Sequence, residues 1–186
     1  MDKYILSFII LAIILLVTVR YLLGIFNKIV MLKKYRDKAF ANIDVLLKKQ
    51  ADLIPQLITI AQQAMIHEKS FFLQLSAVRK NYLGTKIIDE KVKIGNALEH
   101  QLSLLLMLAE NYPTLISQPT FQHLQAQITL LANQIADRRE FFNKSVALYN
   151  MGIKQFPNII FARILRYKPY VFQDASRRQG SESPGA

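Results

Sequence analysis

The sequence predicts an all-α protein in which a single N-terminal transmembrane helix is followed by an elongated antiparallel helical bundle. The first observation is an apolar run over residues 5–26, and the second is helical spacing of apolar residues along most of the remaining chain. The third is the near absence of the alternating apolar and polar residues that mark half-buried strands. We expect a transmembrane anchor (1–27), a helical bundle (28–172) and a disordered tail (173–186) of small and polar residues.

The composition excludes several classes of protein. The 186 residues include 24 Lys and Arg against 13 Asp and Glu, a formal charge of +11, and no Cys. Without Cys, a disulfide scaffold, thiol catalysis and Cys-ligated metal centres are excluded. The basic residues are scattered and no nucleic-acid motif is present, so we expect no nucleic-acid partner.

The apolar run is long enough to cross a membrane. A helix over residues 5–26 would span about 33 Å, and the hydrocarbon core of a bilayer is about 30 Å thick. The strictly uncharged part, residues 4–19, is shorter, which predicts that Arg20 lies near one interface and extends toward the headgroups. A cleaved signal peptide fits less well, because no small-x-small cleavage site follows the run.

The charges that flank the run predict its orientation. Lys3 precedes it and is offset by Asp2, whereas a basic cluster follows: Arg20, Lys28, Lys33, Lys34, Arg36 and Lys38. The excess of cations favours the cytoplasmic side, so the N terminus is expected outside and the bundle in the cytoplasm. The cluster has a second interpretation, in which it also binds anionic lipid headgroups at about 1 kcal/mol per cation.

Four helices are expected to form the bundle. The first has an apolar stripe that steps by three and four residues, and Pro55 then marks either a reversal at 50–55, with Asp52 as the cap, or a kink in a continuous helix. The second runs on to Gly84, where a left-handed C-terminal residue would end it. The stripe of the first helix is Leu32, Tyr35, Ala39, Ile43 and Leu46, and that of the second is Leu53, Leu57, Ile60, Ala64, His67, Phe71, Leu75, Val78 and Tyr82.

The third helix is expected from about 86 to 111, where Pro113 stops it. The fourth is expected from about 121 to 156, with apolar heptad positions from Phe121 to Phe156 that are interrupted at Arg138, Ser145 and Gly152, and Pro157 ends it. Such a repeat predicts the slightly inclined packing of a helical bundle.

A short amphipathic helix is expected at 158–170. If the chain reverses at 50–55, four antiparallel helices return this segment to the membrane-proximal end, where it would meet the bilayer. If Pro55 only kinks a helix, the segment lies at the distal tip.

Several ordered blocks resemble the LemA family. Residues 42–57 (NIDVLLKKQADLIPQL) are similar to its IDVQLKRRxDLIPNL signature, and His67-Glu68 stands where the family has its His-Glu pair. The departures are Phe40, where the family usually has Trp, and residues 131–134 (LANQ), where it has Thr-Glu-Asn-Arg. Further blocks in family order are 112–115, 121–125, 135–150, 156–158 and 167–169. The resemblance implies a bacterial, membrane-anchored antiparallel helical bundle in the inner membrane, and it implies no catalytic residue or cofactor.

The residues themselves offer little chemistry. His67-Glu68 resembles the start of a zinc-protease motif, but Phe71 occupies the position of its second histidine. His100 and His123 have no ligand partners at helical spacing, and phosphate-binding and nucleophile motifs are absent from the sequence. We therefore expect no enzyme, no metal and no cofactor.

Polar residues close to the apolar stripes are the remaining candidates. They form interhelical hydrogen bonds that set the register of the bundle, or they form a polar groove for a partner. A pair of Arg139 with Asp44 or Asp52 is one such hypothesis. The candidate interaction or register residues are Asn42, Asp44, Asp52, Arg139, Asn143 and Asn150, and Gln56 and Arg138 also lie near these stripes.

Two functions follow as hypotheses. The first is a non-enzymatic interaction or scaffold module that presents a helical surface to another membrane-associated protein. The alternative is a lipid-binding or membrane-shaping protein that uses the basic juxtamembrane cluster and the 158–170 segment.

Overall fold

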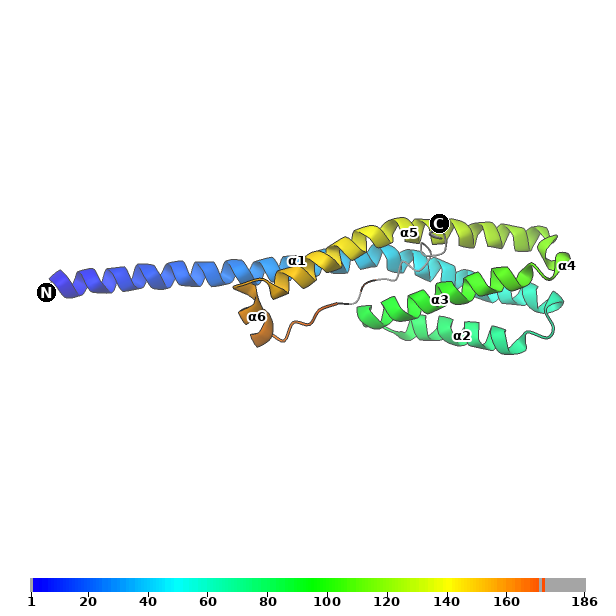
Figure 1. The fold of residues 1–186 in the computed structure, drawn as a ribbon, viewed down its shortest axis with the longest axis horizontal. Helices are drawn as coiled ribbons and strands as arrows, with labels where there is room; N and C mark the ends of the chain where they lie inside the picture. The colour runs from blue at the N-terminus through cyan, green and yellow to red at the C-terminus, as the bar shows by residue number, and fades with distance from the viewer. Residues whose placement is uncertain (1, 171, 173–186) are drawn as a thin grey trace, which may run out of the picture. The chain divides into compact units, whose positions relative to one another are not determined.

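The computed structural model describes residues 2–170 and 172, and every regular element in this range is a helix (Figure 1). The predicted all-α fold class is confirmed. The tail predicted over 173–186 lies outside the described residues. The helices are α1 (Asp2–Ala64), α2 (Lys69–Gly84), α3 (Ile88–Ala109), α4 (Pro113–Ile116), α5 (Pro119–Lys154) and α6 (Asn158–Ile164).

The chain forms two compact units. Unit 1 consists of residues 2–36 and 145–170, and unit 2 consists of residues 37–144. Unit 1 therefore contains the first part of α1, the end of α5 and all of α6. Unit 2 contains the second part of α1, α2, α3, α4 and most of α5.

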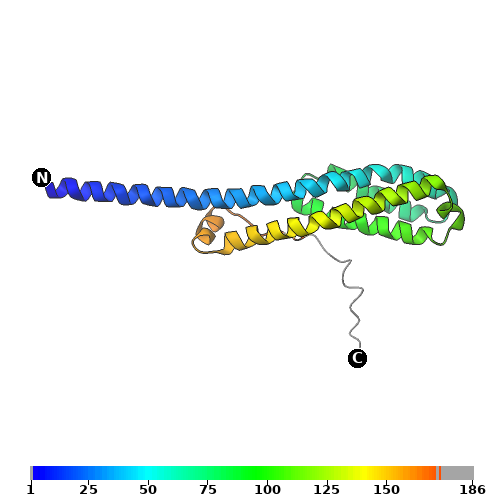
Figure 2. The same ribbon diagram turned by 90° about the horizontal axis from the view of Figure 1, so that it is seen from above.

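Unit 2 is the helical bundle, in which α1, α2, α3 and α5 lie side by side (Figure 2). A repeat of seven residues explains its core, because positions seven apart return to nearly the same face of a helix. On α1 the buried apolar residues Phe40, Leu47, Ile54 and Ala61 follow this repeat, and on α5 Phe121, Ile128, Ile135 and Phe142 do so. The aromatic rings of Phe40 and Phe142 lie 5.6 Å apart.

The chain reverses at 65–68, so the alternative of a reversal at 50–55 is wrong, and the alternative of a helix that continues through Pro55 is the one found. α1 continues through Pro55 to Ala64, and α2 starts at Lys69. Residues 53–64 therefore belong to α1, and His67, expected on a helical stripe, lies exposed in the turn. The number of long helices in the bundle is still four, because the reversal has only moved along the chain.

Other helix ends also differ from expectation. The described glycines all have negative φ, so Gly84 is not in the left-handed conformation, and Thr85 continues as extended chain.

The helix expected over 158–170 ends at Ile164. There Arg166 has a φ of 55°, and Tyr167 N–H donates to the carbonyl of Ala162 at 2.9 Å, which is a Schellman motif. Phe156, expected in the heptad core, is exposed beyond the end of α5.

Unit 1 has a small apolar core of its own. Ile25 and Ile29 of α1 pack with Tyr149 and Ile153 of α5 and with Ala162 of α6. Figures 1 and 2 both show α6 folded back beside α1. The segment after α5 thus contacts the part of α1 that directly follows the apolar run. Leu32, Phe161, Tyr167 and Tyr170 pack against this core.

The N-terminal part of α1 is long and apolar enough to cross a membrane. Its most apolar 18-residue window has a mean hydropathy of 2.6, and only 6% of that window is buried in the structure. A core helix of a soluble protein would be mostly covered by other helices. Residues 4–24 are instead exposed, and Ile25 is the first buried side chain.

Candidate functional site

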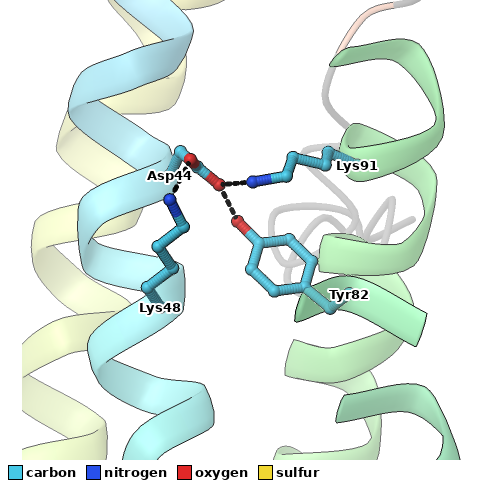
Figure 3. Close-up of polar contacts among 4 residues, drawn as sticks. All are labelled: Asp44, Lys48, Tyr82 and Lys91. Atoms are coloured by element: carbon cyan, nitrogen blue, oxygen red, sulfur yellow. Dashed lines mark hydrogen bonds and ion pairs between the residues drawn. The ribbon is translucent and has the colours of Figure 1, made fainter. Parts of the chain in front are cut away.

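The side chain of Asp44 is the centre of a polar cluster between three helices of unit 2 (Figure 3). Tyr82 of α2 donates its hydroxyl to Asp44 Oδ1 at 2.6 Å, and Lys91 of α3 donates from Nζ to the same oxygen at 2.6 Å. Lys48, one turn along α1, lies 3.0 Å from Oδ2. Asp44 therefore joins α1 to both α2 and α3.

This geometry changes the acidity of both acidic groups in the cluster. Burial raises the pKa of the Asp44 carboxyl, but the hydrogen bonds from Lys91, Tyr82 and Lys48 lower it by more in sum, so its pKa lies below the ordinary value of an aspartic acid. Burial, followed by the hydrogen bond to Asp44, raises the pKa of the Tyr82 phenol above its ordinary value. At neutral pH the cluster contains a carboxylate and a neutral phenol, and Asp44 has the role of an interhelical link.

Arg139 pairs with Glu99 and lies 3.5 Å from the amide oxygen of Asn96, both on α3. The hypothesis that it pairs with Asp44 or Asp52 is wrong, because Asp44 is bonded elsewhere and Asp52 is exposed on α1. The pair lines a cavity of about 230 Å³ with Gln50, Asn96, Ser103 and Thr129. Gln50 is 1% exposed and donates to the carbonyl of Ile128 at 3.3 Å. Such a polar cavity is suited to ordered water.

A third polar contact explains how α1 passes through Pro55. Proline has no N–H, so the carbonyl of Ala51, four residues earlier, lacks its usual helical donor. Arg79 Nε of α2 donates to this carbonyl at 2.6 Å. Ala51 is fully buried, so the missing hydrogen bond would otherwise leave a buried polar atom unpaired. The guanidinium replaces the donor that Pro55 removes.

The other candidate residues lie in different surroundings. Asn42 is exposed and lines a shallow groove of unit 2 with Gln134 and Arg138. Asn143 is partly buried on α5. Asn150 binds the backbone of Tyr170 twice, accepting its N–H at 2.8 Å and donating to its carbonyl at 3.0 Å. The six candidates therefore do not form one site.

The basic juxtamembrane cluster is also divided. Arg36 is 2% exposed, and its guanidinium carbon lies 3.3 Å from the centre of the Tyr170 ring, so Arg36 is not available to lipid headgroups. Lys33 is partly buried, with Nζ 5.9 Å from the ring centre of Tyr167. Lys34 is exposed, and Lys38, also exposed, belongs to unit 2.

Arg20 and Lys28, in contrast, line a pocket of unit 1. The pocket has a volume of about 490 Å³ and lies between α1 and the turn from α5 to α6. Phe156, Pro157 and Asn158 form its other side. It holds two exposed cations about two helical turns apart, Arg20 near the end of the apolar run and Lys28 just after it.

Sequence reasoning missed Arg79, Lys91, Glu99 and the burial of Arg36. Two of these have a signal in the sequence. A proline inside a helical pattern implies an orphan carbonyl four residues earlier, which requires a donor. Position 36 lies seven residues from both Ile29 and Ile43, in the same heptad frame. The partners Lys91 and Glu99 carry no such signal, because the register between helices determines them.

Comparison with known proteins agrees with this architecture. Three magnetosome proteins are similar: MamQ of Magnetospirillum gryphiswaldense (strain MSR-1), 24% identical over 69% of this chain, and MamQ 2 and MamQ 1 of Paramagnetospirillum magneticum (strain AMB-1), each 31% identical over 46%. The chain covers 57% of the length of the first relative and 30% of the other two. With the exposed apolar helix, these relatives indicate a membrane-associated helical protein. Residues 39–185, most of the chain, match the LemA family profile, and this protein therefore belongs to the LemA family.

Proposed function

We propose that this protein is a non-enzymatic scaffold, anchored by one membrane span, that presents a helical surface of unit 2 to another membrane-associated protein. The membrane is the bacterial inner membrane, and unit 2 lies on its cytoplasmic side. The polar residues of the bundle support this proposal, because Asp44, Arg139 and Arg79 use their hydrogen bonds to join helices and leave no convergent catalytic pair among themselves.

The observation that carries the proposal is an apolar groove at the turn between α1 and α2. It has a volume of about 380 Å³, and buried Met65 and Phe72 form its floor. Ile66 and Leu73 stand at its rim with exposed fractions of 61% and 72%. A groove with a methionine floor and aliphatic rim fits the apolar face of a partner helix. Lys69 also lines the groove and favours an acidic residue on that helix.

The groove predicts where a partner can be captured. A photo-crosslinking amino acid at Leu73 should trap one membrane-associated protein in native membranes, and one at Ile66 should trap the same protein. The control is position 107 on α3, because Met107 is similarly exposed at 60% but does not line the groove.

Binding by the purified partner then tests the groove itself. With the full chain in lipid nanodiscs, Leu73→Asp should weaken binding of the captured protein at least tenfold, because it places a carboxylate in an apolar contact. Met107→Asp should change binding less than twofold. Equal effects of the two variants, or capture at position 107 alone, would contradict the proposal.

A further inference from the structure

The positive charge of this protein is concentrated in unit 1. Residues 2–36 and 145–170 contain ten Lys and Arg against one acid, Asp2. Residues 37–144, by comparison, contain twelve Lys and Arg and ten Asp and Glu, and so are nearly balanced. The part of the chain that contains the apolar run thus attracts anions, whereas the bundle has no such bias.

The last segment of unit 1 is bound to α5 by hydrogen bonds and packs against α1. Asn150 binds both backbone groups of Tyr170, and Asn158, which is buried, donates to the carbonyl of Gly152 at 2.8 Å. Ala162, on the same face of α6 as Asn158, packs into the core with Ile25 and Ile29. These contacts fix which face of α6 points outward.

The outward face of this segment is apolar. Ile160 and Ile164 lie one turn apart on α6 with exposed fractions of 50% and 71%, and Phe156, in the turn before α6, is 79% exposed. Ile159 and Leu165 are exposed beside them. A contiguous apolar surface on a soluble protein marks an interaction site. Its neighbours along the chain are cations, since Lys154, Arg163 and Arg166 are also exposed.

The position of this surface identifies its occupant. It adjoins the pocket lined by Arg20 and Lys28, and both lie where α1 leaves its apolar run. Apolar side chains flanked by cations at the end of a membrane span match the layered chemistry of a bilayer, with acyl chains below and phosphates above. A protein partner at this place would need a surface that is both acidic and apolar. A membrane of anionic lipids has both properties, because it presents phosphates above acyl chains.

We propose that unit 1 binds anionic phospholipids of the membrane that α1 crosses. Arg20 and Lys28 bind the headgroup phosphate in the pocket, and Phe156, Ile160 and Ile164 insert among the upper acyl chains. Arg36 takes no part, since it is buried against Tyr170. This contact is separate from the protein contact of unit 2, so either can fail without the other.

A dye placed on the outward face tests insertion. The chain has no native cysteine, so Ile164→Cys can be labelled alone with an environment-sensitive dye in the full chain in nanodiscs. The nanodiscs consist of phosphatidylcholine with a trace of one spin-labelled lipid. In one preparation this lipid is phosphatidylglycerol and in the other it is phosphatidylcholine, and both carry the spin label near the headgroup. The dye at 164 should be quenched by either lipid. The control dye at Leu73→Cys, equally exposed but on unit 2, should not be quenched. Equal and negligible quenching at both sites overturns the proposal.

The ratio of the two quenchers tests the headgroup contact. Spin-labelled phosphatidylglycerol should quench the dye at 164 at least threefold more than spin-labelled phosphatidylcholine, and 0.5 M salt should reduce this ratio. The ratio should approach one in Arg20→Gln/Lys28→Gln and fall partway in Lys28→Gln alone. It should be unchanged in the control Lys49→Gln/Lys80→Gln, which removes two exposed cations of unit 2. A ratio of one in the unaltered chain, or equal losses in both double variants, overturns binding of anionic headgroups.

Discussion

Individual polar residues in this protein connect helices through groups that would be costly to leave unpaired. Asp44 shows this most clearly, because its two oxygens accept from three donors on three helices. Lys91 is 8% exposed, whereas half of the Lys48 side chain is exposed. The contribution of a charge-assisted hydrogen bond depends on how well water can replace it. The two lysines on the same carboxylate should therefore contribute unequally.

We predict that Lys91→Met lowers the free energy of unfolding by about 2 kcal/mol, because it removes the buried one of the two lysines that pair with the largely buried Asp44 carboxylate. Lys48→Met should cost less than about 0.5 kcal/mol, since water replaces its amine. Urea unfolding followed by circular dichroism at 222 nm measures both. Equal losses of unfolding free energy in the two variants would mean that the buried pair with Lys91 stabilises the fold no more than the exposed pair with Lys48.

The pKa of Asp44 predicts a dependence of stability on pH. Because the pKa of Asp44 is lower in the folded protein than in the unfolded chain, the carboxylate contributes stability above the pKa of the unfolded chain. The contribution is lost as pH falls through the folded pKa. The difference in unfolding free energy between the unaltered protein and Asp44→Asn should be constant above about pH 5 and shrink below pH 4. A difference that grows on acidification would contradict this sign.

At the scale of elements, α1 depends on its neighbours for its continuity. A proline in the interior of a helix usually costs about 3 kcal/mol, in part through its missing hydrogen bond. Here α2 supplies a donor through Arg79 at the carbonyl of Ala51. At the end of α5, the contact of Gly152 with α1 is instead close van der Waals packing. A Cβ at Gly152 would clash with Cδ1 of Leu32 on α1.

A double-mutant cycle tests the link between Pro55 and Arg79. Arg79→Met should cost about 1–2 kcal/mol in the unaltered chain, because it orphans a buried carbonyl. In a Pro55→Ala background the new N–H satisfies that carbonyl, so the same substitution should cost less than half as much. Urea unfolding of the unaltered chain, the two single variants and the double variant gives the interaction energy between Pro55 and Arg79. Additive effects within about 0.3 kcal/mol would show that the two sites are independent.

Gly152 predicts how the end of α5 responds to a larger side chain. Gly152→Val should force Leu32 aside and loosen the packing of unit 1, so amide hydrogen exchange over 158–167 should accelerate at least tenfold in the full chain. Exchange over 72–82 should not change. Gly84→Ala is the matched control, since no atom lies within 4 Å of the added Cβ. Its exchange should match the unaltered chain.

At the scale of the whole molecule, charge has a segregated distribution along the chain. Arg20 lies near the end of the apolar run, Lys28, Lys33 and Lys34 follow the run, and no acid stands between Asp2 and Asp37. Basic residues within about 15–20 positions of a span bias it toward the cytoplasmic side. The bundle that follows, residues 37–144, is nearly neutral and contributes little to this bias.

We predict that the C terminus is cytoplasmic. A reporter that is active only in the cytoplasm should work when fused after Ala186, and one that is active only outside should not. Replacing Lys28, Lys33 and Lys34 with Gln and adding three Lys after Met1 should shift a measurable fraction of the fusion to the opposite orientation. Activity of the external reporter in the unaltered chain would contradict the charge argument.

The sequence by itself determined which segments are helical and where most of them end. Heptad spacing on α5 and the prolines at 113 and 157 place the helix ends within a few residues, because periodicity and the missing proline N–H are local properties. The apolar run and the family resemblance are likewise visible in the residues alone. All of these signals depend on neighbours along the chain, so no tertiary contact is needed to find them.

Only the tertiary structure decided where the chain reverses and which polar groups pair. Pro55 is a helix breaker by its own chemistry, and it is accommodated because Arg79 arrives from another helix. Arg139 pairs with Glu99 because the register of α5 against α3 brings the two together, and no spacing within one helix specifies that register. Arg36 is buried because Tyr170, over 130 positions away, covers it. Contacts between distant segments offset local preferences, and for that reason local preferences do not predict them.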